Sequence, residues 1–260
     1  MQHVLAFDTA TAHGGAALLC ADGRSSVHRQ RVTTHSESLL QLAESCLHDC
    51  HVRVGELGGI ACSAGPGSFT GLRIGMATAK GLCFALGLPL CTISSLETLA
   101  RSAYGPALQH PTLAILDAFR GQLFARLLPP AEADSPGAVQ RVFAAVPQLA
   151  VDAMWQPADL VHAVQSLAGA FQLCGVDPLP ASAQPLVDVA RSVRLDGGAT
   201  AAACDLRDGI EPPPLALARL AQDRLRRGQR ADLYSAAPNY LCGSAPEEAE
   251  RQRLLANQTL

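Results

Sequence analysis

The sequence predicts an α/β protein of two lobes, and three observations lead to this prediction. The chain has 260 residues, of which 48% are hydrophobic, enough for one large core or two smaller ones. Short apolar runs alternate with segments of helical periodicity over residues 1–105. An apolar run that ends in an aspartate and returns after a glycine occurs twice, near Asp8 and near Asp117. We therefore expect two lobes that begin in a related way.

The first lobe is expected to open with an antiparallel meander. HVLAFDT predicts a strand, AALLC predicts another after a glycine-bearing turn through HGG, and the segment near SVHRQRV predicts a third. Thr34-His35-Ser36-Glu37 fits a capping box and begins a helix, as does Ser94-Ser95-Leu96-Glu97 later. GGIACSAG and LPLCTIS are typical of buried parallel strands. The predicted order is three strands, helix, strand, helix, strand, helix, with a mixed sheet covered by helices on both faces.

The second lobe begins with TLAILDAFRGQLFARLL, which predicts two strands around the Gly121 turn. Residues 129–150 and 175–200 are rich in proline, glycine and small residues, so we expect loops there. LALARLAQDRLRRG predicts an amphipathic helix. The expected division is a first lobe at 1–105, a smaller second lobe at 106–211, a C-terminal helix and strand-like end at 212–242 that packs back near the lobe junction, and a polar tail at 243–260.

Charge and composition limit the cell compartments and the classes of partner that we expect for this protein. A net charge of -3 and a pI near 6.2 give no global attraction to nucleic acid. The arginines between Arg219 and Arg230 are expected to complement the negative end of their helix, and contact with RNA phosphates is the alternative. MQHVLAFDTA resembles neither a signal peptide nor a membrane span. The nine cysteines are mostly isolated in apolar runs, as reduced core residues are. We expect a cytoplasmic protein with no membrane partner.

The glycine-rich segment GPGSFTGLRIGMATAKG does not fit the known phosphate or nucleophile motifs. Lys80 is followed by Gly81 rather than by Ser or Thr, which excludes a Walker A loop. The glycines do not follow the G-x-G-x-x-G spacing, and no G-x-S-x-G elbow surrounds Ser63 or Ser68. The glycines therefore need another explanation.

A helix beginning near Ser68 gives these glycines a shared face. The apolar stripe of that helix contains Phe69, Leu72, Met76, Ala79, Cys83 and Leu86. Gly67, Gly71 and Gly75 recur every four residues beside the stripe and form a ridge without side chains. Interior glycines weaken a helix by about 1 kcal/mol each, so close backbone approach must offset them. We expect the ridge to face a partner, and packing within the chain is the open alternative.

These segments together resemble one protein family. The glycine segment, the preceding HSESLLQL, LDAFRGQLFA and the late PNYL closely resemble the TsaB (formerly YeaZ) family, bacterial proteins required to make threonylcarbamoyladenosine in tRNA. The resemblance covers residues 1 to about 125 and returns at Pro238 to Leu241. It implies an actin-like ATPase, or ribonuclease H-like, fold of two lobes. It also implies that the chain is a scaffold for the paralogue TsaD, which transfers threonylcarbamoyl to the adenosine following the anticodon, at tRNA position 37.

The resemblance implies a set of partners and an interface. The partners are a TsaD-type catalytic subunit, a TsaE-type ATPase in the assembled complex, a second copy of the chain when it is alone, and tRNA only through the complex. We expect the interface on the first two helices, at His35, Ser36, Leu39, Gly67, Phe69, Gly71, Ile74, Gly75 and Thr78.

No catalytic residue and no metal site is expected. Asp8, Thr9 and Thr11 lie where actin-like ATPases place their first phosphate loop, and we interpret this loop as vestigial. The catalytic relative holds a metal with an H-x-x-x-H pair, a spacing that none of the eight histidines has. No cofactor is expected, apart from ATP or ADP at a shared interface in the complex. One alternative is an actin-like small-molecule kinase or ATPase. The other is a peptidase, which is disfavoured because the sequence has neither the metal-binding histidine pair nor the G-x-S-x-G nucleophile elbow.

Overall fold

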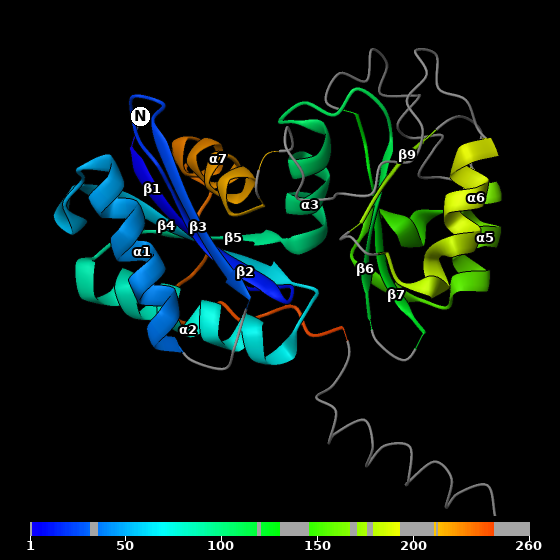
Figure 1. Cartoon of the computed structure of the whole chain (residues 1–260), viewed down its shortest axis with the longest axis horizontal. Coiled ribbons are helices and arrows are strands. Elements are labelled where there is room, and N and C mark those ends of the chain that lie inside the picture. Colours follow the sequence, from blue (N-terminus) through cyan, green and yellow to red (C-terminus); the bar gives the residue numbers. More distant parts are fainter. Residues whose placement is uncertain are drawn as a thin grey trace, which may run out of the picture.

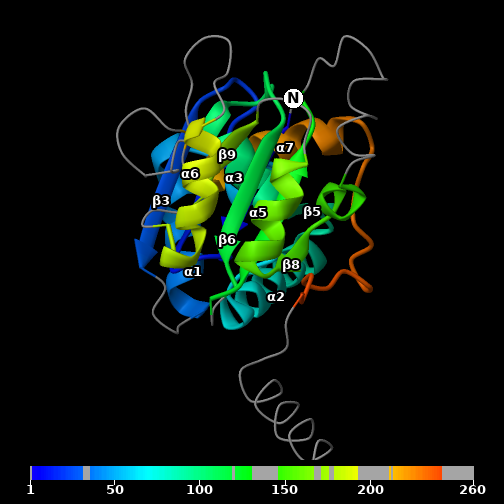
Figure 2. The ribbon, with the colours of Figure 1, turned by 90° about the vertical axis from the view of Figure 1, so that its right-hand side faces the viewer.

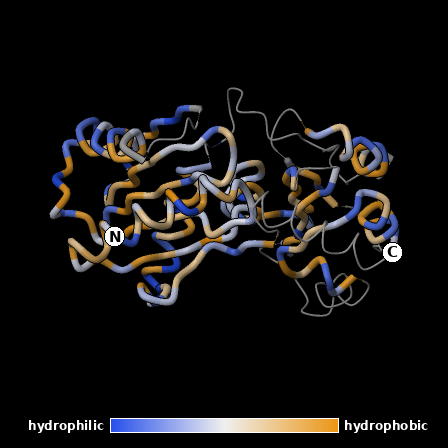
Figure 3. Tube along the Cα trace, turned by 90° about the horizontal axis from the view of Figure 1, so that it is seen from below, coloured by the Kyte–Doolittle hydropathy of each residue, from blue (hydrophilic) through white to orange (hydrophobic). Residues whose placement is uncertain are grey.

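The computed structural model describes residues 2–31, 36–118, 121–130, 146–166, 171–175, 179–192, 211 and 213–241. These residues form two lobes, each built on one sheet, with helix α3 between them (Figure 1). Seen from below, outer helical turns alternate between hydrophobic and hydrophilic residues in both lobes (Figure 3). The molecule thus has two cores that meet along a central helix.

The first lobe contains a five-stranded sheet in the order β3-β2-β1-β4-β5. The strands are β1 (His3–Asp8), β2 (His13–Leu19), β3 (Ser25–Arg31), β4 (Leu57–Gly65) and β5 (Leu90–Ser94). Strands β1 to β3 are antiparallel, and β4 and β5 run parallel to β1, as the sequence predicts. The predicted turn through HGG is wrong: Gly14 and Gly15 lie inside β2, because the chain already reverses over residues 9–12.

Helices cover both faces of this sheet (Figures 1 and 2). They are α1 (Ser36–Cys50), α2 (Phe69–Leu86) and α7 (Pro213–Arg226). On one face, Leu39 of α1 and Met76 of α2 share a core with Phe7 of β1. On the other face, Leu217 of α7 packs with Val4. The first two helices, on which the interface is expected, thus lie on the same face of the sheet. Thr34 and His35, within the first predicted capping box, lie outside the described residues.

Helix α3 (Ser95–Tyr104) joins the two cores. Ser94 caps it, since its hydroxyl accepts a hydrogen bond from the Glu97 amide at 3.4 Å, as the second predicted capping box requires. The Glu97 carboxylate does not complete that box, because it instead accepts hydrogen bonds from Arg224 of α7 at 2.7 Å. The other side of α3 packs Leu96 and Leu99 against strands of the second sheet. The predicted boundary at residue 105 therefore follows a helix that contacts both lobes.

The second lobe contains a four-stranded sheet in the order β8-β7-β6-β9. Its elements are β6 (Thr112–Asp117), β7 (Leu123–Leu128), β8 (Ala153–Trp155), α5 (Pro157–Gln165), β9 (Gln172–Cys174) and α6 (Gln184–Ser192). Helices α5 and α6 cover the face opposite α3. Two mixed sheets with helices on both faces are the two-lobed, actin-like fold that the sequence predicts. The predicted tail at 243–260 lies outside the described residues.

The described cysteines agree with the prediction of a reduced core. Cys20, Cys46, Cys50, Cys62, Cys83, Cys91 and Cys174 are buried, and none forms a disulfide within the part of the chain that the structure describes. Burial raises the pKa of the Cys62 thiol to about 12, which keeps it protonated and weakly nucleophilic at neutral pH. These cysteines therefore serve as small apolar core residues.

Candidate functional site

The turn after β1 lies against the N-terminal end of α2. The Thr9 amide donates to the Ser63 hydroxyl of β4 at 3.2 Å, and the Ser68 amide donates to the Ala10 carbonyl at 2.7 Å. Ser68 also caps α2, since its hydroxyl accepts from the Gly71 amide at 3.2 Å. The Ser68 and Gly71 amides at this helix start are thus engaged within the chain.

The glycine ridge is filled by this same turn. A Cβ on Gly67 would overlap the Ala10 carbonyl, and a Cβ on Gly71 would overlap the Thr9 carbonyl. A Cβ on Gly75 would overlap the Thr9 hydroxyl. Both helical glycines are buried, so the prediction that this ridge faces a partner is wrong. The glycines allow the β1 turn to approach the backbone of α2.

Asp8 is buried beneath the turn as part of the same structure. Its side chain is 6% exposed, and one carboxylate oxygen accepts a hydrogen bond from the Ala10 amide at 3.2 Å. Burial raises the pKa of Asp8, and this effect outweighs the lowering by the Ala10 amide, the Ser63 hydroxyl and the charge of Arg29. The carboxylate therefore belongs to an internal network rather than to an open metal or phosphate site.

Arg29 and Gly15 are residues of this network that the sequence analysis missed. Asp8 pairs with Gly15 across β1 and β2, and Gly15 pairs with Arg29 across β2 and β3. A Cβ on Gly15 would lie 2.6 Å from the His28 carbonyl and 2.8 Å from Cγ of Arg29, so glycine allows the backbone of β3 to approach closely at this position. If HGG had been predicted as part of a strand rather than as a turn, Asp8, Gly15 and Arg29 would have been expected as neighbours across three adjacent strands.

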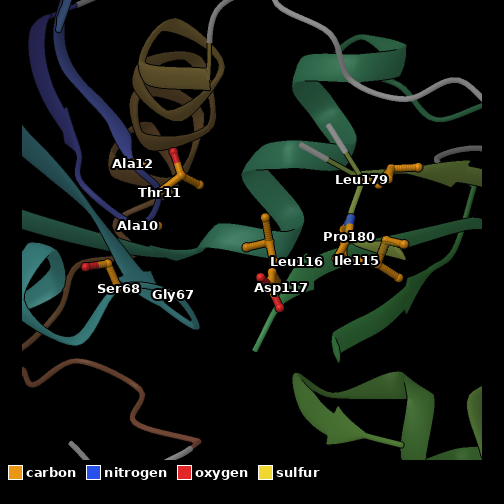
Figure 4. A pocket seen from close by; sticks show the side chains of 10 residues that line it. All are labelled: Ala10, Thr11, Ala12, Gly67, Ser68, Ile115, Leu116, Asp117, Leu179 and Pro180. Carbon is orange, nitrogen blue, oxygen red and sulfur yellow. The ribbon is translucent and has the colours of Figure 1, made fainter. Parts of the chain in front are cut away.

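A cavity of about 400 Å³ lies between the lobes (Figure 4). It is lined by Ala10, Thr11, Ala12, Gly67, Ser68, Ile115, Leu116, Asp117, Leu179 and Pro180. Its polar groups are the Thr11 and Ser68 hydroxyls on one side and the Asp117 carboxylate on the other. Among the described residues of this lining, none is basic. Of the loop predicted to be a vestigial phosphate loop, Thr11 thus borders this cavity.

The predicted interface residues divide between core and surface. Leu39 is buried in the core, and Phe69 is half-buried against the ring of Tyr240 at 4.8 Å between centroids. Ile74 and Thr78 are half-buried, and Ile74 packs against the core that α1 and α2 share. His35 and the side chain of Ser36 lie outside what the structure describes.

The outer face of α2 carries different residues. Phe84 is 73% exposed and Leu40 of α1 is 43% exposed. The other exposed residues of α2 are Arg73 and four small residues, Thr70, Ala77, Gly81 and Ala85. Gly81 has no other atom within 4 Å of a hypothetical Cβ. This exposed face of small residues lies beside the glycine ridge that was predicted to be the interface. The helical period of 3.6 residues could have identified the exposed face once the buried face was known.

The arginines from Arg219 to Arg227, in α7 and just after it, are paired with acids. Arg219 pairs with Glu211, Arg224 with Glu97 at 2.7 Å, and Arg227 with Asp223 at 2.7 Å. The expectation that they complement the end of their helix is thus incomplete, since intramolecular ion pairs engage them as well. No helix of the described residues is long and apolar enough to cross a membrane. The described part of the chain also brings together no cluster of three or more His, Cys, Asp or Glu that suits a metal ion.

Comparison with known proteins places the chain in a family. A family model described as TsaD, tRNA N6-adenosine threonylcarbamoyltransferase, matches residues 29–172. The tRNA threonylcarbamoyladenosine biosynthesis protein TsaB of Bacillus subtilis is 38% identical over 128 residues, which are 48% of this chain and 54% of that protein. TsaB of Escherichia coli is 33% identical over 122 residues, 46% of this chain and 52% of that protein. The chain belongs to the TsaB (YeaZ) family.

A solved structure supports the fold of this TsaB-family chain. YeaZ from Pseudomonas aeruginosa superimposes with a TM-score of 0.63 at 24% identity, covering 93% of this chain and all of that one. The sequence matches are narrower: the chain spans about half the length of the curated TsaB relatives it matches. Sequence similarity thus lies in part of the chain, whereas the fold is shared over nearly all of it.

Proposed function

We propose that this protein is a non-catalytic scaffold subunit for threonylcarbamoylation of tRNA, and that it binds a TsaD-type paralogue through the outer faces of α1 and α2. The relatives it matches are named for threonylcarbamoyladenosine biosynthesis, and the matching family model is that of the transferase. A paralogue of the same fold would meet this chain through a helical face, since helices form the outside of the first lobe.

The observation that carries this proposal is the exposure of Phe84. A phenylalanine that is 73% exposed, on a helix whose neighbouring outer residues are small, is typical of a contact point for another protein. Leu40 of α1 is also exposed, at 43%. The small residues Ala77, Gly81 and Ala85 allow a partner helix to approach the backbone closely.

The cleft supports the non-catalytic part of the proposal. Phosphoryl transfer would need amides at the start of α2 and a carboxylate open to a metal. Here the Ser68 amide is bonded to Ala10, the glycines are packed against Thr9, and Asp8 is buried with its pKa raised.

Co-purification with the TsaD-type subunit of the same organism tests the proposal. Ala77→Arg places a long charged side chain on the exposed outer face of α2, and we expect it to abolish complex formation while circular dichroism stays unchanged. Val151→Arg is the matched control, since Val151 is 61% exposed on the second lobe. Wild-type binding by Ala77→Arg, or loss of binding by the Val151→Arg control alone, would contradict this interface.

An actin-like kinase or ATPase is the second candidate, because Asp8 and Asp117 end equivalent strands on the two sides of the cleft. We expect the isolated chain to hydrolyse no ATP and to cleave no peptide above background. Turnover in a pure preparation that Asp8→Ala abolishes would favour the kinase.

Addition of a TsaE-type ATPase, tRNA and ATP or ADP to the co-purified pair would show whether they join the complex. Sedimentation of the chain alone would test the homodimer, and cell fractionation would test the cytoplasmic location.

A further inference from the structure

The segment after α7 returns along the first lobe and ends on α2 (Figure 1). We name residues 231–241 the C-terminal strap. At its start, the Ala231 amide donates to the Leu90 carbonyl of β5 at 2.8 Å. Near its end, the Asn239 amide donates to the Ala64 carbonyl of β4 at 2.6 Å. Leu233 and Ala236 pack against the core under α1 and α2. The strap is therefore fastened at both ends and partly buried.

Lys80, the only lysine in the sequence, holds the middle of the strap. Its ammonium donates to the Tyr234 carbonyl at 3.2 Å and to the Ala236 carbonyl at 2.9 Å. An ammonium suits this position, because it carries several donors on a flexible stem and each bond to a neutral carbonyl is strengthened by its charge. Lys80 thus joins two strap carbonyls to one turn of α2.

The end of the strap is held by an aromatic and cationic stack. Tyr240 lies against Phe69 with 4.8 Å between ring centroids, and its hydroxyl accepts from Nε of Arg73 at 3.2 Å. The Arg73 guanidinium lies 4.0 Å from the centroid of the Phe69 ring. Phe69, Arg73 and Lys80 share one side of α2, so the strap follows that side from the N-terminal turn onward.

The strap leaves the outer face of α2 uncovered. Phe84, one turn beyond Lys80 on the same side, remains 73% exposed. Tyr234, whose carbonyl Lys80 binds, is 81% exposed. Two large aromatic side chains are thus presented to solvent next to a single lysine, although the backbone that carries each is well anchored. Aromatic residues on a rigid support are typical of interface anchors.

We propose that the docking surface for the TsaD-type paralogue continues from α2 onto the C-terminal strap, with Phe84 and Tyr234 as its aromatic anchors and Lys80 as the residue that positions Tyr234. This inference rests on the proposed function. The partner contributes apolar side chains that cover both rings. The strap does not cover the docking face, because Ala77, Gly81 and Ala85 stay exposed beside it. It therefore borders the docking surface and leaves it open to the partner.

Affinity measurements with the purified paralogue test the anchors. We expect Phe84→Ala and Tyr234→Ala each to weaken binding by about tenfold or more, as truncation of an interface anchor does. Val151→Ala, on the second lobe, truncates another exposed apolar side chain, 61% exposed, and should bind like the wild type. If the wild-type chain forms no complex, the proposed function fails, and this inference with it. If the complex forms, Ala77→Arg prevents it and both alanine variants bind normally, only the strap inference is wrong.

Lys80 variants test positioning separately from overall folding. Lys80→Gln removes the charge and shortens the side chain, and Lys80→Arg keeps the charge and donors. We expect Lys80→Gln to speed hydrogen exchange of the Ala231 and Asn239 amides and to weaken the complex several fold, with the urea midpoint nearly unchanged. Lys80→Arg should restore both readouts. Tighter binding by Lys80→Gln would mean that the strap blocks the partner, and unchanged exchange would mean that Lys80 does not hold it; either result overturns the proposal.

Discussion

The two faces of α2 carry glycines for different reasons. On the inner face, Gly71 and Gly75 are buried, and a side chain at either position would overlap Thr9. On the outer face, Gly81 is exposed and has no neighbour within 4 Å of a hypothetical Cβ. The inner glycines are required by the fold, whereas the outer one leaves space that a partner can use. A repeated glycine in a helix therefore indicates that another segment can approach the helix backbone closely, but it does not show whether that segment belongs to the same chain or to a partner.

Replacement of Gly71 is expected to have the largest effect, because the neighbouring Thr9 carbonyl is backbone and cannot rotate away. We expect Gly71→Ala to lower the free energy of unfolding by about 3 kcal/mol, the upper range for overpacking. Urea unfolding followed by circular dichroism measures this change. If Gly71→Ala is as stable as the wild type, the turn after β1 does not fill the ridge, and the contrast between the two faces of α2 fails.

The fold could be predicted from the sequence because its signals are local. The apolar run before Asp8, the capping serines Ser68 and Ser94, and the helical period of α2 each specify their own element. The glycines in HGG misled the prediction, since glycine favours a turn when only neighbours in sequence are considered. In the sheet, Gly15 instead allows close approach of the His28 carbonyl and the Arg29 side chain of the adjacent strand.

The site was less predictable because it depends on contacts distant in sequence. Helical periodicity placed Gly71 and Gly75 on one face but could not show that Thr9, more than sixty residues earlier, packs against them. Likewise, the lone lysine was visible in the sequence, but its bonds to Tyr234 and Ala236 join segments over 150 residues apart. Local patterns in the sequence therefore identify residues such as Gly71, Gly75 and Lys80 as unusual, whereas only the tertiary contacts show their roles.

Asp8 offers a second test of the inner face, through pH. Its pKa is raised above the ordinary value of 3.8, so the folded state binds a proton more readily than the unfolded chain. Stability contributed by this group is present below about pH 4 and is lost as pH rises through the higher pKa of the folded state. We expect Asp8→Asn to remove this decline, so that its free energy of unfolding falls less than that of the wild type as pH rises above about 4. Thermal unfolding at several pH values measures it, and equal slopes for both proteins would show that Asp8 is not buried as described.

Ser68 connects the inner face to the start of α2, and its loss is expected to have a smaller effect. Ser68→Ala removes the acceptor for the Gly71 amide, and loss of an N-cap typically lowers stability by about 1 kcal/mol. Ser68→Thr keeps the acceptor and should remain close to the wild type. Chemical denaturation distinguishes them. Equal destabilisation by both substitutions would mean that the size of the side chain, and not the cap, decides stability at this position.

The smallest expected effect belongs to the outer face and has the opposite sign. Gly81 lies in the interior of a helix with open space around it, so Gly81→Ala should raise the free energy of unfolding by about 0.5 to 1 kcal/mol through a better helix propensity. The same methyl group should weaken the complex with the TsaD-type subunit by a few fold, because it separates the two backbones at the proposed contact. Denaturation and binding measured on one preparation give both values. A stabilised variant that binds at full strength would place the partner elsewhere on α2, whereas a destabilised variant would show that the outer face, like the inner one, is already filled.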